Sequence, residues 1–346
     1  IVLRTGRSKQ GKEYFVLPTG KLDSGLLEKI IFKQIRYRRP EVLVRPGVGE
    51  DCAVVDFAPF ACVLSTDPVT AASAEVGRLA VHVSCNDVAS SGVAPLGVML
   101  SVLLPEGTEE AEAEKIMRQA AETAAELEVE IIGGHTEITS SVTKPIIVST
   151  AIGRGILGAA DFAKDIRPGD SILVTKQVAM EGSGIIARER ADALRGALTP
   201  EELEEAAGML DRISVVKEGL AAGRAGAAAM HDITEGGVLG AVWELCEISK
   251  TGAEIHEEKI PASETTKKIC RHLGLDYLRL ISSGSMMIIS RPEKKEKIFA
   301  ALKEVNVPVA CIGVMKERKE GIYMLSDEER REIGPPGADE IYSVKD

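Results

Sequence analysis

Apolar runs of strand length alternate with stretches of helical period along most of the chain, and this pattern predicts two α/β units. In the first unit, small residues and valines fill 77–91, which favours a helix that packs closely against its neighbours. The elements expected in this unit are strands at 53–55 and 61–65, a helix at 77–91, a strand at 97–104, a helix at 108–127, and strands at 129–132 and 146–153. Such an intermixed order is typical of ferredoxin-like halves.

A second unit is expected after a linker at 154–168 that contains glycine, charge and Pro168. Its expected elements are a strand at 168–175, helices at 182–192 and 200–223, a strand at 227–230, a helix at 238–250, strands near 253–257 and 284–290, a helix at 292–304 and a strand at 308–315. The boundaries that follow are an N-terminal arm and helix at 1–41, a first domain at 42–155, a second domain at 156–330 and a charged tail at 331–346. We expect residues 1–20 to form a mobile arm.

Composition narrows the class of protein. The 346 residues are 45% hydrophobic but only 3% aromatic, which indicates a globular protein with an aliphatic core. The net charge of −11 argues against nucleic acid and anionic membranes as partners. The six cysteines form no CxxC pair, so we expect reduced, mostly buried thiols; His82 and Cys85 are more simply explained by packing than by metal binding. The sequence shows no signal peptide or long apolar span, and we expect a cytoplasmic protein.

Carboxylates stand at the ends of several apolar runs, where strand and helix termini project into clefts. They are Asp51, Asp56, Asp67 and Asp87. Hard cations such as Mg²⁺ take oxygen ligands and are often shared with substrate phosphates, so such a set is a candidate site for a metal-bound nucleotide. Solvated caps and turns are the alternative explanation for each acid taken singly. The Asn86-Asp87 pair, inside a helix of small residues, needs partners for its amide and carboxylate.

Glycine pairs and two lysines add candidate phosphate contacts. Gly133-Gly134 directly follows the strand expected at 129–132, and two glycines there let backbone amides approach a phosphate. Gly236-Gly237 precedes the helix expected at 238–250, and a helix N-terminus binds anions. Lys21 and Lys144 could reach phosphates, although plain turns and solvated lysines remain alternatives. There is no Walker motif and no complete dinucleotide fingerprint.

In combination these motifs resemble a known superfamily. The aminoimidazole-ribonucleotide (AIR) synthase superfamily has similar motifs in the same order. In this chain they are GVGEDCAVVD at 47–56, STD at 65–67, the Asn86-Asp87 helix with SGVAPLG after it, GGHTE at 133–137 and HDITEGGVLGAV at 231–242. The resemblance covers about residues 20–317. Within the superfamily, PGDSILVT and SSGSMMIIS look most like the hydrogenase-maturation HypE branch.

The resemblance implies a fold of two PurM-like domains. The N-terminal α/β domain would join its strands to those of a partner to form a barrel in a homodimer, and the C-terminal domain would be α+β. An ATP site would lie between the domains and across the dimer, and the acceptor would be a small molecule or a protein-borne group that is activated by phosphoryl transfer.

The resemblance also implies roles for individual residues, with ATP and Mg²⁺ as cofactors. The magnesium ligands would be Asp51, Asp67, Asp87 and Asp232. The phosphate contacts would be Lys21, Gly133, Gly134, Thr136, Gly236 and Gly237. The residues at the reacting centre would be Asp87, Asn86 and His135.

Two departures from the HypE pattern leave the acceptor open. The chain ends IYSVKD and its last cysteine is Cys311, whereas HypE proteins end in a cysteine that carries the reacting group; we therefore expect no support of hydrogenase cyanide-ligand synthesis. HypE proteins have a sequence similar to GGDTK where this chain has GGHTE. His135 and Glu137 stand in place of the aspartate and the lysine, which reverses the local charge. The alternatives are a kinase of the thiamine-monophosphate type and a nucleotide-binding regulatory protein without turnover.

Overall fold

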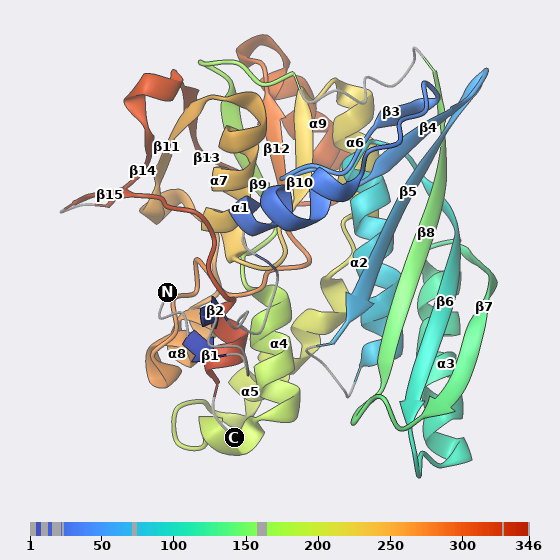
Figure 1. The fold of residues 1–346 in the computed structure, drawn as a ribbon. Coiled ribbons are helices and arrows are strands. Elements are labelled where there is room, and N and C mark those ends of the chain that lie inside the picture. Colours follow the sequence, from blue (N-terminus) through green and yellow to red (C-terminus); the bar gives the residue numbers. More distant parts are fainter. Residues whose placement is uncertain are drawn as a thin grey trace.

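The computed structural model describes residues 5–7, 13–15, 22, 24–70, 75–157, 165–326 and 329–344. Over these residues the chain forms two units that lie side by side, each built on one large sheet with helices against it (Figure 1). The first sheet has the strand order β3-β4-β5-β8-β6-β7, and the second has the order β10-β12-β9-β13-β11-β14-β15. The expectation of two mixed α/β units is confirmed.

The first unit is a six-stranded sheet covered on one face by two helices (Figure 1). Its elements are β3 (Val42–Val44), β4 (Ala53–Phe57), β5 (Phe60–Val69), α2 (Val76–Ser90), β6 (Pro95–Pro105), α3 (Glu110–Glu126), β7 (Glu130–Thr139) and β8 (Ile146–Ile156). Burial alternates along β8, because every second side chain points toward α2 and the side chains between them point away from the helices. Apolar residues on the uncovered face include Leu64, Met99 and Ile152.

The second unit has a longer list of elements. They are β9 (Ser171–Thr175), α4 (Met180–Glu189), α5 (Pro200–Ala207), α6 (Val216–Ala225), β10 (Ala229–Asp232), α7 (Gly237–Ser249), β11 (Gly252–His256), α8 (Glu264–Leu273), β12 (Met286–Ser290), α9 (Lys295–Glu304), β13 (Val309–Lys316), β14 (Ile322–Leu325) and β15 (Arg330–Glu332). All side chains of β10 and β12 are buried. Although β10 is an edge strand of this sheet, α2 and α7 pack against it.

Three sequence expectations are wrong in detail. The single helix expected at 200–223 is two helices, α5 and α6, separated by a 3₁₀ turn at Gly208–Arg212. The strand expected at 129–132 continues as β7 through the glycine pair to Thr139. The amphipathic helix α8, with its Ser263 cap, is absent from the expected elements.

The N-terminal part of the chain contains short elements. The helix expected within 1–41 is present as α1 (Ser24–Leu26), continued by a π-helical turn at Leu27–Ile31 and a 3₁₀ turn at Phe32–Gln34. In the arm, β1 (Thr5–Arg7) pairs with β2 (Glu13–Phe15), and the other residues of 1–21 lie outside the described set. In the described part of the chain, no helix combines the length and the apolar character that a membrane crossing requires.

Helix α2 joins the two units, since it contacts the first sheet on one side and α6 and β10 on the other (Figure 1). The backbones of α2 and α6 nearly touch: a Cβ built on Gly219 would lie 2.4 Å from the carbonyl oxygen of Ala89. The Asn86 side chain completes the joint, because its Nδ2 donates to the Ile213 carbonyl at 2.9 Å and its Oδ1 accepts from the Val215 amide at 2.8 Å. This joint fixes the C-terminal half of α2, which carries Asp87, against the second unit.

We predict that Gly219→Ala lowers the free energy of unfolding by about 1–3 kcal/mol, because the added methyl group must push α6 away from the α2 backbone. The matched control is Gly208→Ala, since Gly208 has a negative φ and no atom lies within 4 Å of the place that the alanine methyl group would take. Denaturant unfolding of both variants and the parent would check this, and equal midpoints for all three proteins would contradict it.

Candidate functional site

Carboxylates from three segments of the first unit meet where β5 faces α2. The Ser65 hydroxyl lies 3.0 Å from Asp67 Oδ2 and 2.5 Å from Asp87 Oδ2, so it donates to one of the two at a time. One turn along α2, the Ser90 hydroxyl lies 2.8 Å from Oδ2 of Asp51, which precedes β4. The structure therefore brings together three of the acids that the sequence pattern singled out.

The second unit adds a histidine and two more carboxylates from the end of β10 and from α7. The Nδ1 atom of His231 contacts the Asp51 carboxylate, and its Nε2 lies 3.0 Å from Glu244 Oε2. One ligand atom each of Asp51, His231 and Asp232 lies within 4.8 Å of the other two. The sequence analysis selects Asp232 but misses His231 and Glu244. Glu244 could have been noticed, because it is the one charged residue on the buried side of a helix that is otherwise apolar there.

Burial and mutual repulsion dominate the electrostatics of this cluster. Desolvation, followed by the nearby charges of Asp232 and Asp67, raises the pKa of Asp87 well above its ordinary value. Desolvation, followed by the charge of Asp51, raises the pKa of Asp232 to about 7. Asp232 is 1% exposed, and within the described residues its buried Oδ2 has no hydrogen-bond partner. Buried oxygens of this kind fit a divalent cation, which prefers carboxylate ligands.

Asn86 has a role in joining the two units. Its side chain is fully buried, and both ends of its amide are bonded to the backbone of 213–215. These two bonds make Asn86 a positioning residue, which holds α2, and through it Asp87, against the second unit; its assignment to the reacting centre stays a prediction.

The GGHTE segment does not join the carboxylates within one protomer. In the sheet register, Asp67 of β5 pairs with Ser149, Ser149 with Leu100, and Leu100 with Gly134 of β7. Three strand spacings separate the two segments, which is about 14 Å. His135 alternates to the uncovered face of the sheet, where its Nε2 lies 3.2 Å from Glu137.

The close packing of β7 gives a structural reason for the second glycine of the pair. A Cβ on Gly134 would lie 2.0 Å from the Leu100 carbonyl oxygen, and the φ of Gly134 is +149°. The expectation that these glycines follow a strand end was wrong, because β7 runs through them. Gly133, Gly134, His135 and Thr136 are all exposed on this strand at the edge of the sheet.

The predicted anion site at the start of α7 is taken by the chain itself. The Gly236 amide donates to Oδ2 of Asp339 at 2.7 Å, and Oδ1 of the same carboxylate accepts from Ile281 and Ile341. Gly237, the first residue of α7, adopts a left-handed φ of +61°, and a Cβ there would meet the Leu278 carbonyl at 2.4 Å. Helix packing and the Asp339 cap therefore account for this glycine pair.

The remaining candidates lie elsewhere. Asp56 accepts from the Ala58 amide in the turn that connects β4 to β5. Lys144 is exposed before β8, and Lys21 lies outside the described residues. All six cysteines are free, and four of them are buried, as expected.

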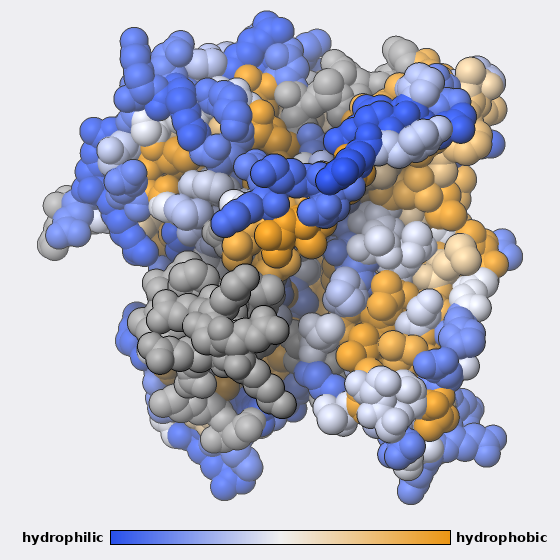
Figure 2. Space-filling view, in the orientation of Figure 1, coloured by the Kyte–Doolittle hydropathy of each residue, from blue (hydrophilic) through white to orange (hydrophobic). Residues whose placement is uncertain are grey.

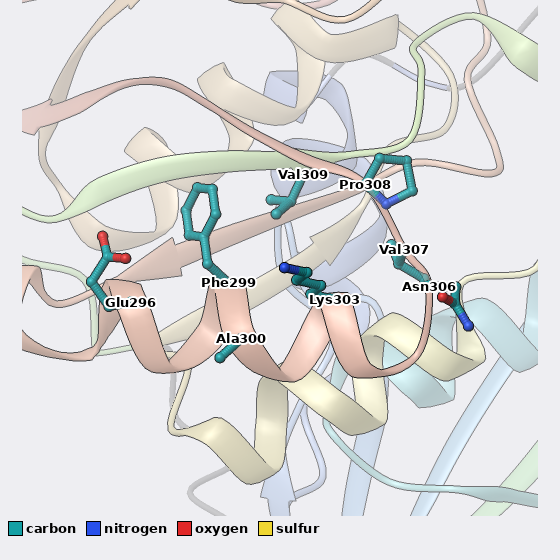
Figure 3. A pocket seen from close by; sticks show the side chains of 8 residues that line it. All are labelled: Glu296, Phe299, Ala300, Lys303, Asn306, Val307, Pro308 and Val309. Atoms are coloured by element: carbon teal, nitrogen blue, oxygen red, sulfur yellow. The ribbon is translucent and has the colours of Figure 1, made fainter.

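A pocket with a cavity volume of about 570 Å³ lies beside α9 and the start of β13 (Figure 3). Phe299, Ala300 and Val309 give it apolar walls, and Glu296 and Asn306 stand at opposite ends. None of the clustered carboxylates lines this pocket. Because this pocket has no carboxylate cluster that could hold a metal ion, the candidate site remains the acid cluster between the units.

Two family models match the chain. Residues 49–155 match the model of the AIR synthase related protein, N-terminal domain, and residues 167–325 match that of the AIR synthase related protein, C-terminal domain. A putative hydrogenase expression/formation protein of Methanocaldococcus jannaschii is 30% identical over 342 residues, which are 94% of this chain and 97% of that protein. The carbamoyl dehydratase HypE of Bradyrhizobium diazoefficiens is 28% identical over 263 residues, 74% of each chain.

Solved structures share the fold. The hydrogenase maturation protein HypE in complex with ATP superposes with a TM-score of 0.67 at 22% identity, covering 92% of this chain and 95% of that one. A structure described as AaThiL complexed with AMPPCP and TMP gives a TM-score of 0.72 at 21% identity, covering 94% and 99%. The two domains of this chain are therefore PurM-like, as in the HypE structures.

We predict that the metal-free protein loses stability as pH rises from about 4 to about 7. The folded-state pKa values of Asp87 and Asp232 are raised, so the native state retains protons that the unfolded chain has released, and this stabilisation disappears as pH rises through the folded pKa, about 7 for Asp232. The slope should approach about 1.4 kcal/mol per pH unit for each such proton. Denaturant unfolding in the presence of a chelator measures it, and Asp232→Asn should flatten the profile; an unchanged slope in that variant would contradict the assignment.

Proposed function

This chain belongs to the AIR synthase related family, and from that premise we propose that it is an ATP-dependent enzyme of the HypE-like branch. It would bind Mg-ATP at the carboxylate cluster between the two units and activate an acceptor by phosphoryl transfer. The observation that carries the proposal is the convergence of Asp51, Asp67, Asp87 and Asp232 from four separate segments, with a buried, unpartnered oxygen on Asp232.

The donor set fits magnesium, since it offers carboxylate oxygens where phosphate charge must be neutralised. Mg²⁺ held by these four acids would supply that neutralisation. The rest of the chain acts by positioning: Ser65 holds the Asp67 and Asp87 carboxylates together, and Ser90 holds Asp51. Phosphoryl transfer needs little from the protein beyond such positioning and charge stabilisation.

The relatives narrow the acceptor to two classes. The HypE relatives are named carbamoyl dehydratases, which suggests a carbamoyl-type oxygen, borne by a protein or a small molecule, as the group to be activated. The ThiL structures, named as thiamine monophosphate kinase, suggest a phosphate ester instead. Sequence similarity over nearly the whole chain to a hydrogenase expression/formation protein favours the first class.

A homodimer would cover the apolar face of the first sheet. The uncovered face of the six-stranded sheet and its edges carry apolar side chains, visible along the right side of Figure 2. The exposed large residues of this sheet and of the turn between β4 and β5 are Leu43, Phe57, Phe60, Leu96, Met99, Ile132, Ile138 and Ile156. A partner's sheet against this face would bury them.

We predict that ATP binding requires the cation. Calorimetry should show binding with Mg²⁺ and much weaker binding with a chelator, because the carboxylates repel phosphate when no metal is present. Asp87→Asn should weaken Mg-ATP binding by about tenfold or more, because a ligand charge is lost with little change in shape. The matched control is Asp56→Asn, which changes the carboxylate in the turn between β4 and β5. Equal affinity with and without metal would remove the proposal.

We also predict a dimer in solution that depends on the uncovered sheet face. Met99→Glu places a charge on that face and should shift the mass measured by light scattering toward the monomer. Ala111→Glu adds the same charge on the exposed side of α3 and should leave the dimer intact. A parent protein that is monomeric at micromolar concentration would refute the prediction.

A further inference from the structure

Lys176 directly follows β9 and has a backbone conformation that is unusual for lysine. Its φ of +52° lies in the left-handed region, which disfavours residues that carry a Cβ atom. Its side chain is only 17% exposed, although a lysine is rarely buried without a partner. The contacts of this side chain must therefore offset both costs.

The ammonium group of Lys176 holds the 212–214 segment in place. Its Nζ donates to the Ser214 carbonyl at 2.5 Å and to the Arg212 carbonyl at 3.2 Å. The third partner is the carboxylate of Glu218 on α6, whose Oε1 lies 2.7 Å from Nζ. Since an ammonium group has three protons, these three acceptors use all of them, and the segment is fixed to the end of β9.

Asn86 of α2 binds the same segment. Its Nδ2 donates to the Ile213 carbonyl, and its Oδ1 accepts from the Val215 amide. Lys176 thus holds the carbonyls of residues 212 and 214, while Asn86 holds the groups of 213 and 215 that alternate with them. Because Asp87 follows Asn86 on α2, one line of contacts leads from Lys176 to Asp87.

Glu218 extends the contacts toward the other half of the acid cluster. It is 2% exposed, and its Oε1 accepts from the Thr175 hydroxyl at 3.4 Å. The Thr175 hydroxyl oxygen in turn accepts from the Met286 amide at 2.9 Å. Met286 of β12 is the register partner of Asp232 on β10, so a second line of contacts leads from the ion pair to the strand that carries Asp232.

We propose that Lys176 and Glu218 are positioning residues of the candidate site, whose ion pair sets the separation between Asp87 of the first unit and Asp232 of the second. A buried ion pair adds little net stability compared with apolar residues of the same volume, but a fully satisfied polar network is rigid. This positioning rests on the proposed function, because both acids are among those assigned to Mg-ATP. No motif of the sequence gives either residue of the pair a role.

A second left-handed lysine provides a matched control. Lys250 follows α7 with a φ of +56°, and its Nζ lies 3.4 Å from a carboxylate oxygen of Glu247. Its side chain is 75% exposed, and this contact joins residues three positions apart on the surface. Lys250→Met therefore changes a left-handed lysine with a glutamate neighbour without touching the joint between the units.

The first measurement is hydrogen–deuterium exchange of the full-length protein without nucleotide. Lys176→Met keeps the length of the side chain and removes its charge, and the addition of Glu218→Gln leaves no unpaired buried charge. We expect the Val215 amide to exchange at least about tenfold faster in both variants, because the segment that presents it to Asn86 is released. Lys250→Met should exchange as the parent protein does.

The second measurement is calorimetry with Mg-ATP, with Ile255→Ala as a control for stability alone. Ile255 is fully buried in β11, so its truncation lowers stability while the ion pair stays intact. Lys176→Met with Glu218→Gln should weaken Mg-ATP binding by about two- to thirtyfold, because the two acids lose their fixed separation. Ile255→Ala and Lys250→Met should bind Mg-ATP as the parent protein does.

Exchange of the Val215 amide at the parent rate in the double variant would overturn the inference. So would an unchanged Mg-ATP affinity in that variant, or an equal loss of affinity in Ile255→Ala, which would make the ion pair a source of stability only. Glu218→Gln alone, which keeps the shape of the side chain, provides the same measurements where Lys176→Met fails to fold. A parent protein that binds no Mg-ATP would refute the proposed function, and the exchange of the Val215 amide would then decide the positioning by itself.

Discussion

The two hydrogen bonds of the Asn86 amide are the constraint on which the arrangement of the site depends. They join α2 of the first unit to the 213–215 segment of the second, at a place where Gly219 lets the helix backbones approach closely. An apolar residue at 86 would leave a buried amide and a buried carbonyl without partners, which costs about 1–3 kcal/mol for each group. The next residue along α2 is Asp87, so the same joint sets where that carboxylate faces Asp232.

The cluster that results is unfavourable by itself. Carboxylates that are buried beside one another hold protons that they would lose in water, as the raised pKa values of Asp87 and Asp232 show. A protein usually avoids such a set or neutralises it. Here small hydroxyl residues, Ser65 and Ser90, hold the carboxylates close together, which indicates a geometry suited to a cation at some expense of stability.

The two faces of the first sheet have separate tasks. The inner face carries Asp67 toward α2 and the second unit, while the uncovered face presents His135 and apolar residues outward. Alternation along each strand makes this separation unavoidable, because neighbouring residues point to opposite sides.

The sequence by itself determined the two-unit fold and much of the acid cluster. Apolar runs marked most strands, and Asp51, Asp67 and Asp87 each stood at the end of such a run or within a helix of small residues. Only the tertiary structure decided which polar groups meet: that Asn86 bonds backbone, that Asp339 caps α7, and that His231 lies between Asp51 and Glu244. These contacts join residues from about 13 to 180 positions apart, and periodicity reports only on neighbours within a turn or a strand. A histidine or glycine therefore acquires its role from packing that local pattern does not contain.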